Sequence, residues 1–200
     1  KNIIAKTFTT ILIGMVAFLD AQTINRYGTT TANFLEIGVG SRATSMGDAY
    51  VAVANDVSSI YWNPAGLAHV TRSSALFSIQ PWLVDIDMMF AGGAFVVPSL
   101  GVIGLGITHL DYGEMDVTNL QYQDGTGERF GASDVAATFT FSRKIVSWFS
   151  FGSSMKYISS KIWHSSASAF AVDLGVLVNT NFFSFTGKDK DGMNIGMSIS

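Results

Sequence analysis

The chain has 200 residues, of which 48% are hydrophobic and 14% are charged, and its formal net charge is -3. Soluble domains carry about 25% charged residues, so this composition favours a surface that faces something other than water. The negative charge gives no electrostatic support to nucleic-acid binding. The absence of cysteine excludes disulfides, thiolate metal sites and a cysteine nucleophile.

The first 21 residues have the pattern of a secretory signal peptide. Lys1 and Lys6 form a positive start, residues 7–19 form an apolar run, and Ala21 precedes a plausible cleavage point. The run is shorter than the roughly 20 apolar residues that a membrane helix needs. We therefore expect residues 1–21 to export the chain and to take no part in the fold.

Residues 22–73 differ in pattern from the rest of the chain and contain one clear helix start. Asn63 is a residue type that caps helices, and Pro64 suits the first helical position. The sequence therefore predicts a short helix from Pro64 to Ala68.

From Ser74 onward, apolar residues recur mostly at every second position, which predicts strands. Glycine is abundant, with 20 residues, and suits strands better than helices. Most of the predicted strands are about 9–12 residues long, close to the length that crosses a bilayer at a tilt. The seven predicted strands are Ser74–Trp82, Asp87–Val97, Leu100–Asp111, Asp134–Arg143, Trp148–Ser160, Ala169–Val178 and Met193–Ser200.

The two faces of these strands differ in the size of their side chains. In the fourth strand, Phe139 and Phe141 alternate with Thr138 and Thr140. A soluble sandwich also alternates, but its second face normally carries long polar side chains, whereas here that face is largely Gly, Ala and Ser. Small residues suit a crowded barrel interior, and bulky ones suit lipid contact. We therefore predict an all-β transmembrane antiparallel barrel, the closed structure that satisfies its backbone within lipid.

The strand ends and connections support a barrel in an outer membrane. Four aromatic residues at or near strand ends resemble interfacial girdles, namely Trp82, Tyr112, Trp148 and Trp163. Connections at 98–99 and 144–147 are short and the one at 112–133 is long, as expected for periplasmic turns and outer loops. The connection at 179–192 breaks this alternation. Because seven is an odd number of strands, we expect the chain to be part of a longer barrel protein.

The segment from Phe34 to Ala68 resembles the N-terminal signature of the PorV/PorQ family, relatives of the FadL-type hydrocarbon transporters. The matching stretches are Gly38-Val-Gly-Ser-Arg-Ala43, Met46-Gly47, Ala49-Tyr50-Val-Ala-Val-Ala54, Asn55-Asp56 and Tyr61-Trp-Asn-Pro-Ala-Gly-Leu67. The resemblance implies a FadL-like barrel of about 14 strands. It also implies that residues 22–73 fold inward as a short helical plug and that residues 74–200 form the first half of the barrel.

Ten residues of this signature are the candidate site residues. They are Gly38, Gly40, Arg42, Met46, Gly47, Asp56, Asn63, Pro64, Ala65 and Gly66. Gly38, Gly40 and Gly47 would permit close approach of the backbone inside a barrel. Arg42 would be a buried cation that needs a carboxylate, with Asp48 or Asp56 as the candidates.

Rival interpretations of single features are weaker. Gly38, Gly40 and Ala43 match a loose dinucleotide fingerprint, but no βαβ unit surrounds them. His69, His109 and His164 lack partners at metal-ligand spacing. The acidic group at 111–116 sits at the start of a polar loop and suits solvated charges better than a catalytic pair. We therefore expect no enzyme activity, no cofactor and no metal site.

Two functions follow from the resemblance. The first is type IX protein secretion or attachment of exported cargo at the cell surface, with secreted proteins that carry a C-terminal sorting domain, or other secretion components, as partners. The second is outer-membrane transport of long-chain fatty acids or other hydrophobic compounds. Both place the protein among the lipids of the cell outer membrane. An exported soluble β-sandwich that binds a ligand is a third, separate interpretation.

Overall fold

The computed structural model describes residues 32–83, 86–180 and 192–200, all within one compact unit, Ala32–Ser200. The predicted signal peptide at 1–21 and most of the connection at 179–192 lie outside the described residues. Among the described residues, four short helices come first, followed by seven strands. The helices are η1 (Asn33–Glu36), α2 (Ser41–Thr44), α3 (Ser59–Trp62) and η2 (Pro64–His69). The strands are β1 (Ser74–Pro81), β2 (Asp87–Val97), β3 (Gly101–Asp116), β4 (Arg129–Val146), β5 (Phe149–Ile162), β6 (Ser165–Thr180) and β7 (Met193–Ile199).

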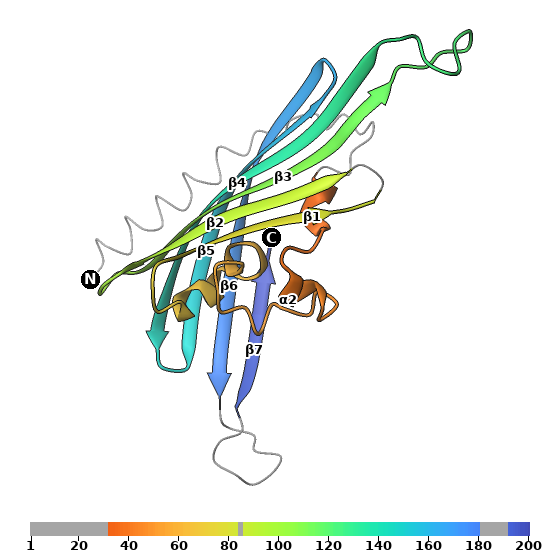
Figure 1. The fold of residues 1–200 in the computed structure, drawn as a ribbon. Helices are drawn as coiled ribbons and strands as arrows, with labels where there is room; N and C mark the ends of the chain where they lie inside the picture. The colour runs from red at the N-terminus through yellow and green to blue at the C-terminus, as the bar shows by residue number, and fades with distance from the viewer. Residues whose placement is uncertain (1–31, 84–85, 181–191) are drawn as a thin grey trace, which may run out of the picture. The chain divides into compact units, whose positions relative to one another are not determined.

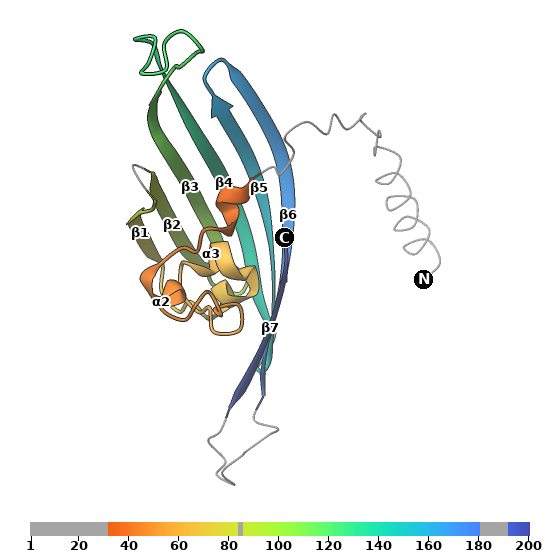
Figure 2. The same ribbon diagram turned by 90° about the vertical axis from the view of Figure 1, so that its right-hand side faces the viewer.

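The seven strands form one antiparallel sheet in the order β1-β2-β3-β4-β5-β6-β7, so each strand pairs with its neighbour in sequence. The sheet curls into a half-barrel, and the short helices lie on its concave side (Figures 1 and 2). The predicted all-β antiparallel architecture is confirmed. None of the helices among the described residues has the length and hydropathy of a transmembrane helix.

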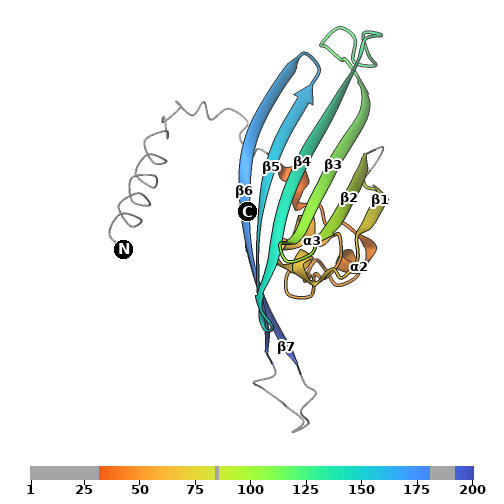
Figure 3. The same ribbon diagram turned by 90° about the vertical axis from the view of Figure 1, so that its left-hand side faces the viewer.

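The strands begin and end close to the predicted positions, but several are longer. β2 spans Asp87–Val97, as predicted, whereas β3 and β4 continue their pairing beyond Asp111 through a bulge to Asp116 and Arg129. This extension is polar, so hydrophobic alternation does not mark it. Its ladder of backbone hydrogen bonds holds it in the sheet, and it projects beyond the end of β2 (Figure 3).

The connection between β5 and β6 differs from the prediction. The sequence predicted an eight-residue connection after Ser160, but both strands continue to a tight turn at Trp163 and His164. Trp163 adopts a φ of 50°, a left-handed conformation that tight turns use. The alternation of short and long connections therefore fails here, because serine-rich strand ends carry no apolar signal.

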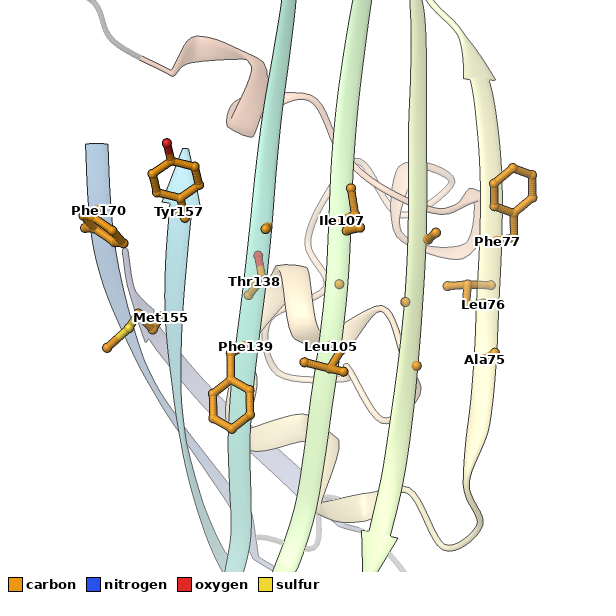
Figure 4. Close-up of a pocket in the computed structure, with 15 residues that line it drawn as sticks. Ala75, Leu76, Phe77, Leu105, Ile107, Thr138, Phe139, Met155, Tyr157 and Phe170 are labelled. Atoms are coloured by element: carbon orange, nitrogen blue, oxygen red, sulfur yellow. The ribbon is translucent and has the colours of Figure 1, made fainter. Parts of the chain in front are cut away.

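Bulky and small side chains lie on opposite faces of the sheet over most of β4 and β5, as predicted, whereas β2 buries the bulky Met88 and Phe90 on the concave face. In β4, Phe139 is 50% exposed on the convex face, whereas the adjacent Thr140 is fully buried on the concave face. Figure 4 shows bulky side chains of β3, β4, β5 and β6 on one face of the sheet, with the short helices behind the strands. The arrangement is the inverse of a soluble sheet, whose bulky side chains are buried.

Three of the four aromatic residues predicted at strand ends are exposed there, namely Trp82, Trp148 and Trp163. Tyr112 differs because it lies within β3 and packs against the buried hydrophobic cluster. Its hydroxyl donates a hydrogen bond of 2.7 Å to Asp134. The prediction that Tyr112 belongs to an interfacial girdle is therefore wrong, since its polar end is satisfied by a side chain of β4.

Candidate functional site: the plug and its seat

The candidate site is the contact between the helical segment and the concave face of the sheet. We call residues 33–69 the plug. Its α3 and η2 helices contact β3 and β4, and η2 also contacts β5 and β6. The seat is defined as the four concave-face glycines at which an added Cβ atom would come closest to the plug, and it consists of Gly104, Gly152, Gly175 and Gly196.

Asn63 connects the plug to the barrel wall. Its side-chain oxygen accepts a hydrogen bond of 3.0 Å from the Ala65 amide, which caps η2 as predicted. Its amide nitrogen donates to the carbonyl oxygens of Val51, at 2.8 Å, and Val176 in β6, at 3.2 Å. The side chain is fully buried. One residue therefore satisfies backbone groups of the helix, the plug loop and the wall.

Pro64 and Ala65 lie directly against two glycines of the seat. A Cβ atom at Gly152 would clash with the backbone of Pro64 and Ala65, and one at Gly175 would clash with the Asn63 side chain. The hydroxyl of Ser142, which pairs with Gly152, donates to the Ala65 carbonyl at 3.3 Å. The Asn-Pro-Ala stretch is therefore held at backbone distance from the wall.

The other two glycines of the seat extend the same contact. A Cβ at Gly104 would lie 2.7 Å from Leu67, and one at Gly196 would lie 2.6 Å from Ala52. Glycine is thus required wherever the plug touches the sheet most closely. The sequence marked the small residues of this face but not which of them the plug covers.

Arg42 belongs to a cluster at the surface of the plug. Its guanidinium lies 3.6 Å from Asp56, donates a 2.9 Å hydrogen bond to Asn55 and sits 5.3 Å from the ring centre of Tyr50. Asp56 is therefore the carboxylate partner. The predicted burial of Arg42 is wrong, since 57% of its side chain is exposed. One face of the Arg42 guanidinium is in contact with water, and the other face covers the ring of the buried Tyr50.

The remaining candidate residues have separate roles. Gly38 and Gly66 permit close approach, because a Cβ there would clash with Asp48 and with the Ala54 carbonyl respectively. A Cβ at Gly40 or Gly47 would meet nothing within 4 Å, and these glycines instead adopt φ values of 88° and 63°. Close approach is therefore the wrong reason for these two, which turn the chain around α2. Met46 is exposed.

Two aromatic residues of the plug donate hydrogen bonds to backbone carbonyl oxygens within the plug. The Tyr61 hydroxyl shares its one proton between the carbonyl oxygens of Leu35 and Ile37, and the Trp62 indole donates to the Val39 carbonyl at 2.9 Å. Burial, together with the charges of Asp48 and Glu36, raises the pKa of Tyr61 above its ordinary value of 10.0. Tyr61 therefore stays a neutral donor. These residues were within the recognised signature, but their hydrogen-bonding role had no signal in the sequence.

A buried ion pair, which the sequence pattern did not single out, lies on the concave wall. Lys156 in β5 and Asp173 in β6 are 2.7 Å apart, with side chains 8% and 3% exposed. The second Asp173 oxygen, Oδ1, has no hydrogen-bond partner among the described residues. The strand alternation places both Lys156 and Asp173 on the concave face, and this was the sequence feature that could have identified the pair. A charge at such a position needs a partner of opposite charge.

His69 links the end of η2 to β5. Its ring nitrogen Nε2 lies 3.0 Å from the Ser150 hydroxyl. Burial and the nearby charge of Lys144 lower the pKa of His69 below its ordinary value of 6.5. In the described part of the chain, no group of three or more His, Cys, Asp or Glu residues is placed to hold a metal ion.

The convex face carries a shallow apolar hollow of about 820 Å³. Its lining includes small residues such as Ala91, Gly93 and Ala137. It also includes the larger side chains of Phe139 and Tyr157 (Figure 4). A hollow with so little polar surface suits hydrocarbon chains of lipid better than water.

A comparison with protein families agrees with this geometry. The family model described as type IX secretion system protein PorV matches residues 20–199. No curated protein matches the chain. The match includes both the plug and all seven strands of the wall. The chain therefore belongs to the PorV family of type IX secretion system proteins.

Proposed function

We propose that this protein is an exported outer-membrane barrel that holds secreted cargo at the cell surface during type IX secretion. Residues 1–21 act as the signal peptide, residues 22–73 as the plug segment, and residues 74–200 as part of a barrel of about 14 strands. The observation that carries this proposal is the combination of the family match with a wall whose bulky side chains face outward.

The β3–β4 hairpin supports a role in binding proteins. Its two strands run past β1 and β2, and the loop at 117–128 lies at the end opposite the β2–β3 and β4–β5 turns (Figure 1). Long loops mark the outer side of bacterial barrels. Leu120 in this loop is 96% exposed and Tyr122 is also exposed. Exposed apolar and aromatic side chains at the tip of a loop are typical of protein contacts.

The base of the hairpin is braced by charges. Arg129 in β4 lies 2.8 Å from Glu114 and 3.1 Å from Asp116, both in β3. All three side chains are exposed, so this cluster contributes little to global stability. It orients the strands that present the loop.

The test is co-purification of secreted proteins with the full-length protein from outer membranes. The wild type should retain cargo that carries a C-terminal sorting domain, and the Leu120→Ser/Tyr122→Ser variant should retain much less. Ile145→Ser is the matched control, since Ile145 is an exposed apolar residue at the opposite end of the wall. Absence of such cargo from the wild-type sample would contradict the proposal.

The alternative function is transport of fatty acids or other hydrophobic compounds. It predicts that the purified barrel carries a bound fatty acid and that the loop substitutions leave secretion unchanged. The same preparations distinguish the two functions when their lipids are extracted and identified.

A further inference from the structure

A second pocket lies at the end of the wall that carries the β3–β4 loop. Its volume is about 580 Å³, and it lies among the ends of β3, β4 and β5 and the turn between β5 and β6. This turn and the β3–β4 loop are at the same end of the sheet (Figure 2). The pocket shares no lining residue with the convex hollow. The two hollows are therefore distinct.

Strand pairing places three polar residues of this pocket on the convex face. Asp111 in β3 pairs with Ser133 in β4, which pairs with Lys161 in β5. Residues that lie opposite each other in an antiparallel pair point to the same face of the sheet. Asp111 also lies an even number of positions from Ile107, which is exposed on the convex face. We call Asp111, Ser133 and Lys161 the polar row.

The polar row lies at the level of lipid headgroups. The apolar row that contains Ile107 and Tyr157 is followed by a row that contains His109 and Ser159, where the hydrocarbon ends. The polar row comes next, about 7 Å further along the strands and about 5 Å further along the bilayer normal. The headgroup layer adds about 5–8 Å to each side of the hydrocarbon. Because long loops mark the outer side of a barrel, the row faces the outer leaflet.

The charges of the polar row lack partners in the part of the chain that the structure describes. Neither Asp111 nor Lys161 forms an ion pair there at 4.0 Å or less. Arg129, which also lines the pocket, is already paired within the β3–β4 hairpin. Asp87 in β2 lies opposite Asp111, and like charges in such a pair repel each other. The β3 end of the row therefore favours a cation and the β5 end an anion.

The surroundings of the polar row suit an amphiphile. Trp163 lines the same pocket and is 45% exposed, and indole rings at this level of a barrel are typical of contact with the membrane interface. On the hydrocarbon side of the row, Phe170 and Tyr157 are exposed, with ring centres 5.1 Å apart. A molecule with two opposite charges and an attached acyl chain would therefore be matched along its whole length.

We propose that this pocket binds the phosphoethanolamine headgroup of a lipid in the outer leaflet. Lys161 and the Ser133 hydroxyl bind the phosphate, and Asp111 accepts hydrogen bonds from the ammonium group. A glycerol headgroup offers no cation to Asp111, and a choline headgroup offers it no N–H donor. The inference rests on the outer-membrane position in the proposed function but is independent of cargo binding.

The experiment measures heat unfolding of the full-length protein in detergent with increasing phosphatidylethanolamine, phosphatidylglycerol or phosphatidylcholine. A lipid that binds the folded state raises the unfolding temperature, so each titration gives an affinity. Phosphatidylethanolamine should bind the wild type most tightly. Asp111→Asn should weaken its binding to the level of phosphatidylglycerol. Lys161→Gln should weaken both lipids about fivefold, because one basic side chain at an anionic surface contributes about 1 kcal/mol.

The choice of variants separates charge from folding. Asp111→Asn keeps the side-chain oxygen that accepts a 3.0 Å hydrogen bond from the Gly113 amide. Lys161→Arg keeps the positive charge and should retain both affinities. Asp124→Asn removes an exposed carboxylate of the loop at 117–128 and should leave the preference intact. A preference that survives Asp111→Asn, or an equal loss in Asp124→Asn, would overturn the proposal.

Two kinds of lipid can carry this headgroup, and lipid A with and without a phosphoethanolamine substituent distinguishes them. Stronger stabilisation by substituted lipid A than by phosphatidylethanolamine assigns a glycolipid, and the reverse assigns a phospholipid. Stabilisation by neither would contradict the inference. Loss of the preference on addition of EDTA would assign the carboxylates to a metal ion, and the headgroup proposal would fail.

Heat-modifiable gel mobility of the same samples tests the barrel separately. A folded barrel should migrate differently before and after heating. A normal mobility shift without a preference for phosphatidylethanolamine contradicts the headgroup pocket alone, whereas an absent shift contradicts the proposed function as well. Lys161→Gln should leave cargo retention unchanged, so lipid binding and cargo binding can fail independently.

Discussion

Asn63 is the residue through which the plug and the wall exchange hydrogen bonds. Replacing it with alanine would leave the carbonyl oxygens of Val51 and Val176 without their donor in a buried place. Each such group costs about 1–3 kcal/mol, so we expect Asn63→Ala to lower the free energy of unfolding by about 2–4 kcal/mol. Denaturant unfolding measures this. Asn119→Ala, which removes an amide that caps an exposed loop turn, should have little effect.

The buried Lys156–Asp173 ion pair should show strong coupling between the effects of substituting its two residues on stability. Removing one partner leaves a buried charge uncompensated, which costs about 3–5 kcal/mol, whereas replacing both with apolar residues is often neutral. We therefore expect Lys156→Met and Asp173→Leu each to destabilise the protein strongly and the double variant to recover most of the loss. A double-mutant cycle in urea measures the coupling. Additive single effects would show that the two charges act independently.

His69 makes the attachment of the plug sensitive to pH. Its pKa is lowered in the folded state from an ordinary value of 6.5, so the unfolded chain takes up the proton first as pH falls. The contribution to stability is full above pH 6.5 and is lost as the pH falls below that value toward the lowered folded pKa. His69→Gln should flatten this part of the pH profile of heat unfolding. His164→Gln, in the opposite turn, should leave it unchanged.

Single residues also show which contacts could be predicted from the sequence and which could not. The carboxylate partner of Arg42 was among the two predicted candidates, but the exposure of the pair depends on where the plug surface ends, which no local pattern encodes. The role of Asn63 as a cap followed from local helix chemistry, whereas its bond to Val176 crosses 113 positions of the chain. Contacts across such separations require the folded wall.

At the level of elements, the plug and the strands fit because glycine replaces side chains where they touch. Gly152→Ala should push the plug from the wall, since the added methyl group meets the Pro64 and Ala65 backbone. Overpacking of this kind costs about 1–3 kcal/mol and often more against backbone. Limited proteolysis within the plug should become faster.

Gly93→Ala is the matched control for this substitution. Gly93 lies in a strand of the same sheet, but its added methyl group would meet the nearest atoms of Phe95 at 3.4 Å and 3.6 Å, without touching the plug. Protection of the plug should be unchanged. Equal sensitivity of both variants to protease would show that the loss reflects strand propensity and not the contact with the plug.

The strands were predictable where one face is apolar and not where both faces are polar. The bounds of β2 match the prediction, because an apolar run from Met88 to Val97 follows Asp87 and ends at Pro98. The extended ends of β3 and β4, and the serine-rich ends of β5 and β6, are held by pairing with the neighbouring strand. Cross-strand hydrogen bonds stabilise these segments without any hydrophobic signal in the sequence.

At the scale of the whole molecule, one rule of side-chain size organises the described structure. Over β4 and β5, mostly small residues on the concave face leave room for a plug built from short helices, and bulky residues on the convex face stay exposed, whereas β2 buries the bulky Met88 and Phe90. The charged residues follow a second rule, with acids toward the end that carries the β3–β4 loop and the cations Arg143 and Lys144 toward the end that carries the β2–β3 and β4–β5 turns. Both rules suit a wall that stands in a bilayer with its plug inside.

The most direct test of this account is the orientation of residues 137–142 of β4 in a lipid bilayer. The chain has no cysteine, so single cysteines introduced at these positions take a spin label without further changes. Collision with oxygen, which concentrates in lipid, should be high at 137, 139 and 141 and low at 138, 140 and 142. A water-soluble nickel complex should reach none of the odd positions. Free access of that complex to position 139, or no alternation along the strand, would contradict the account.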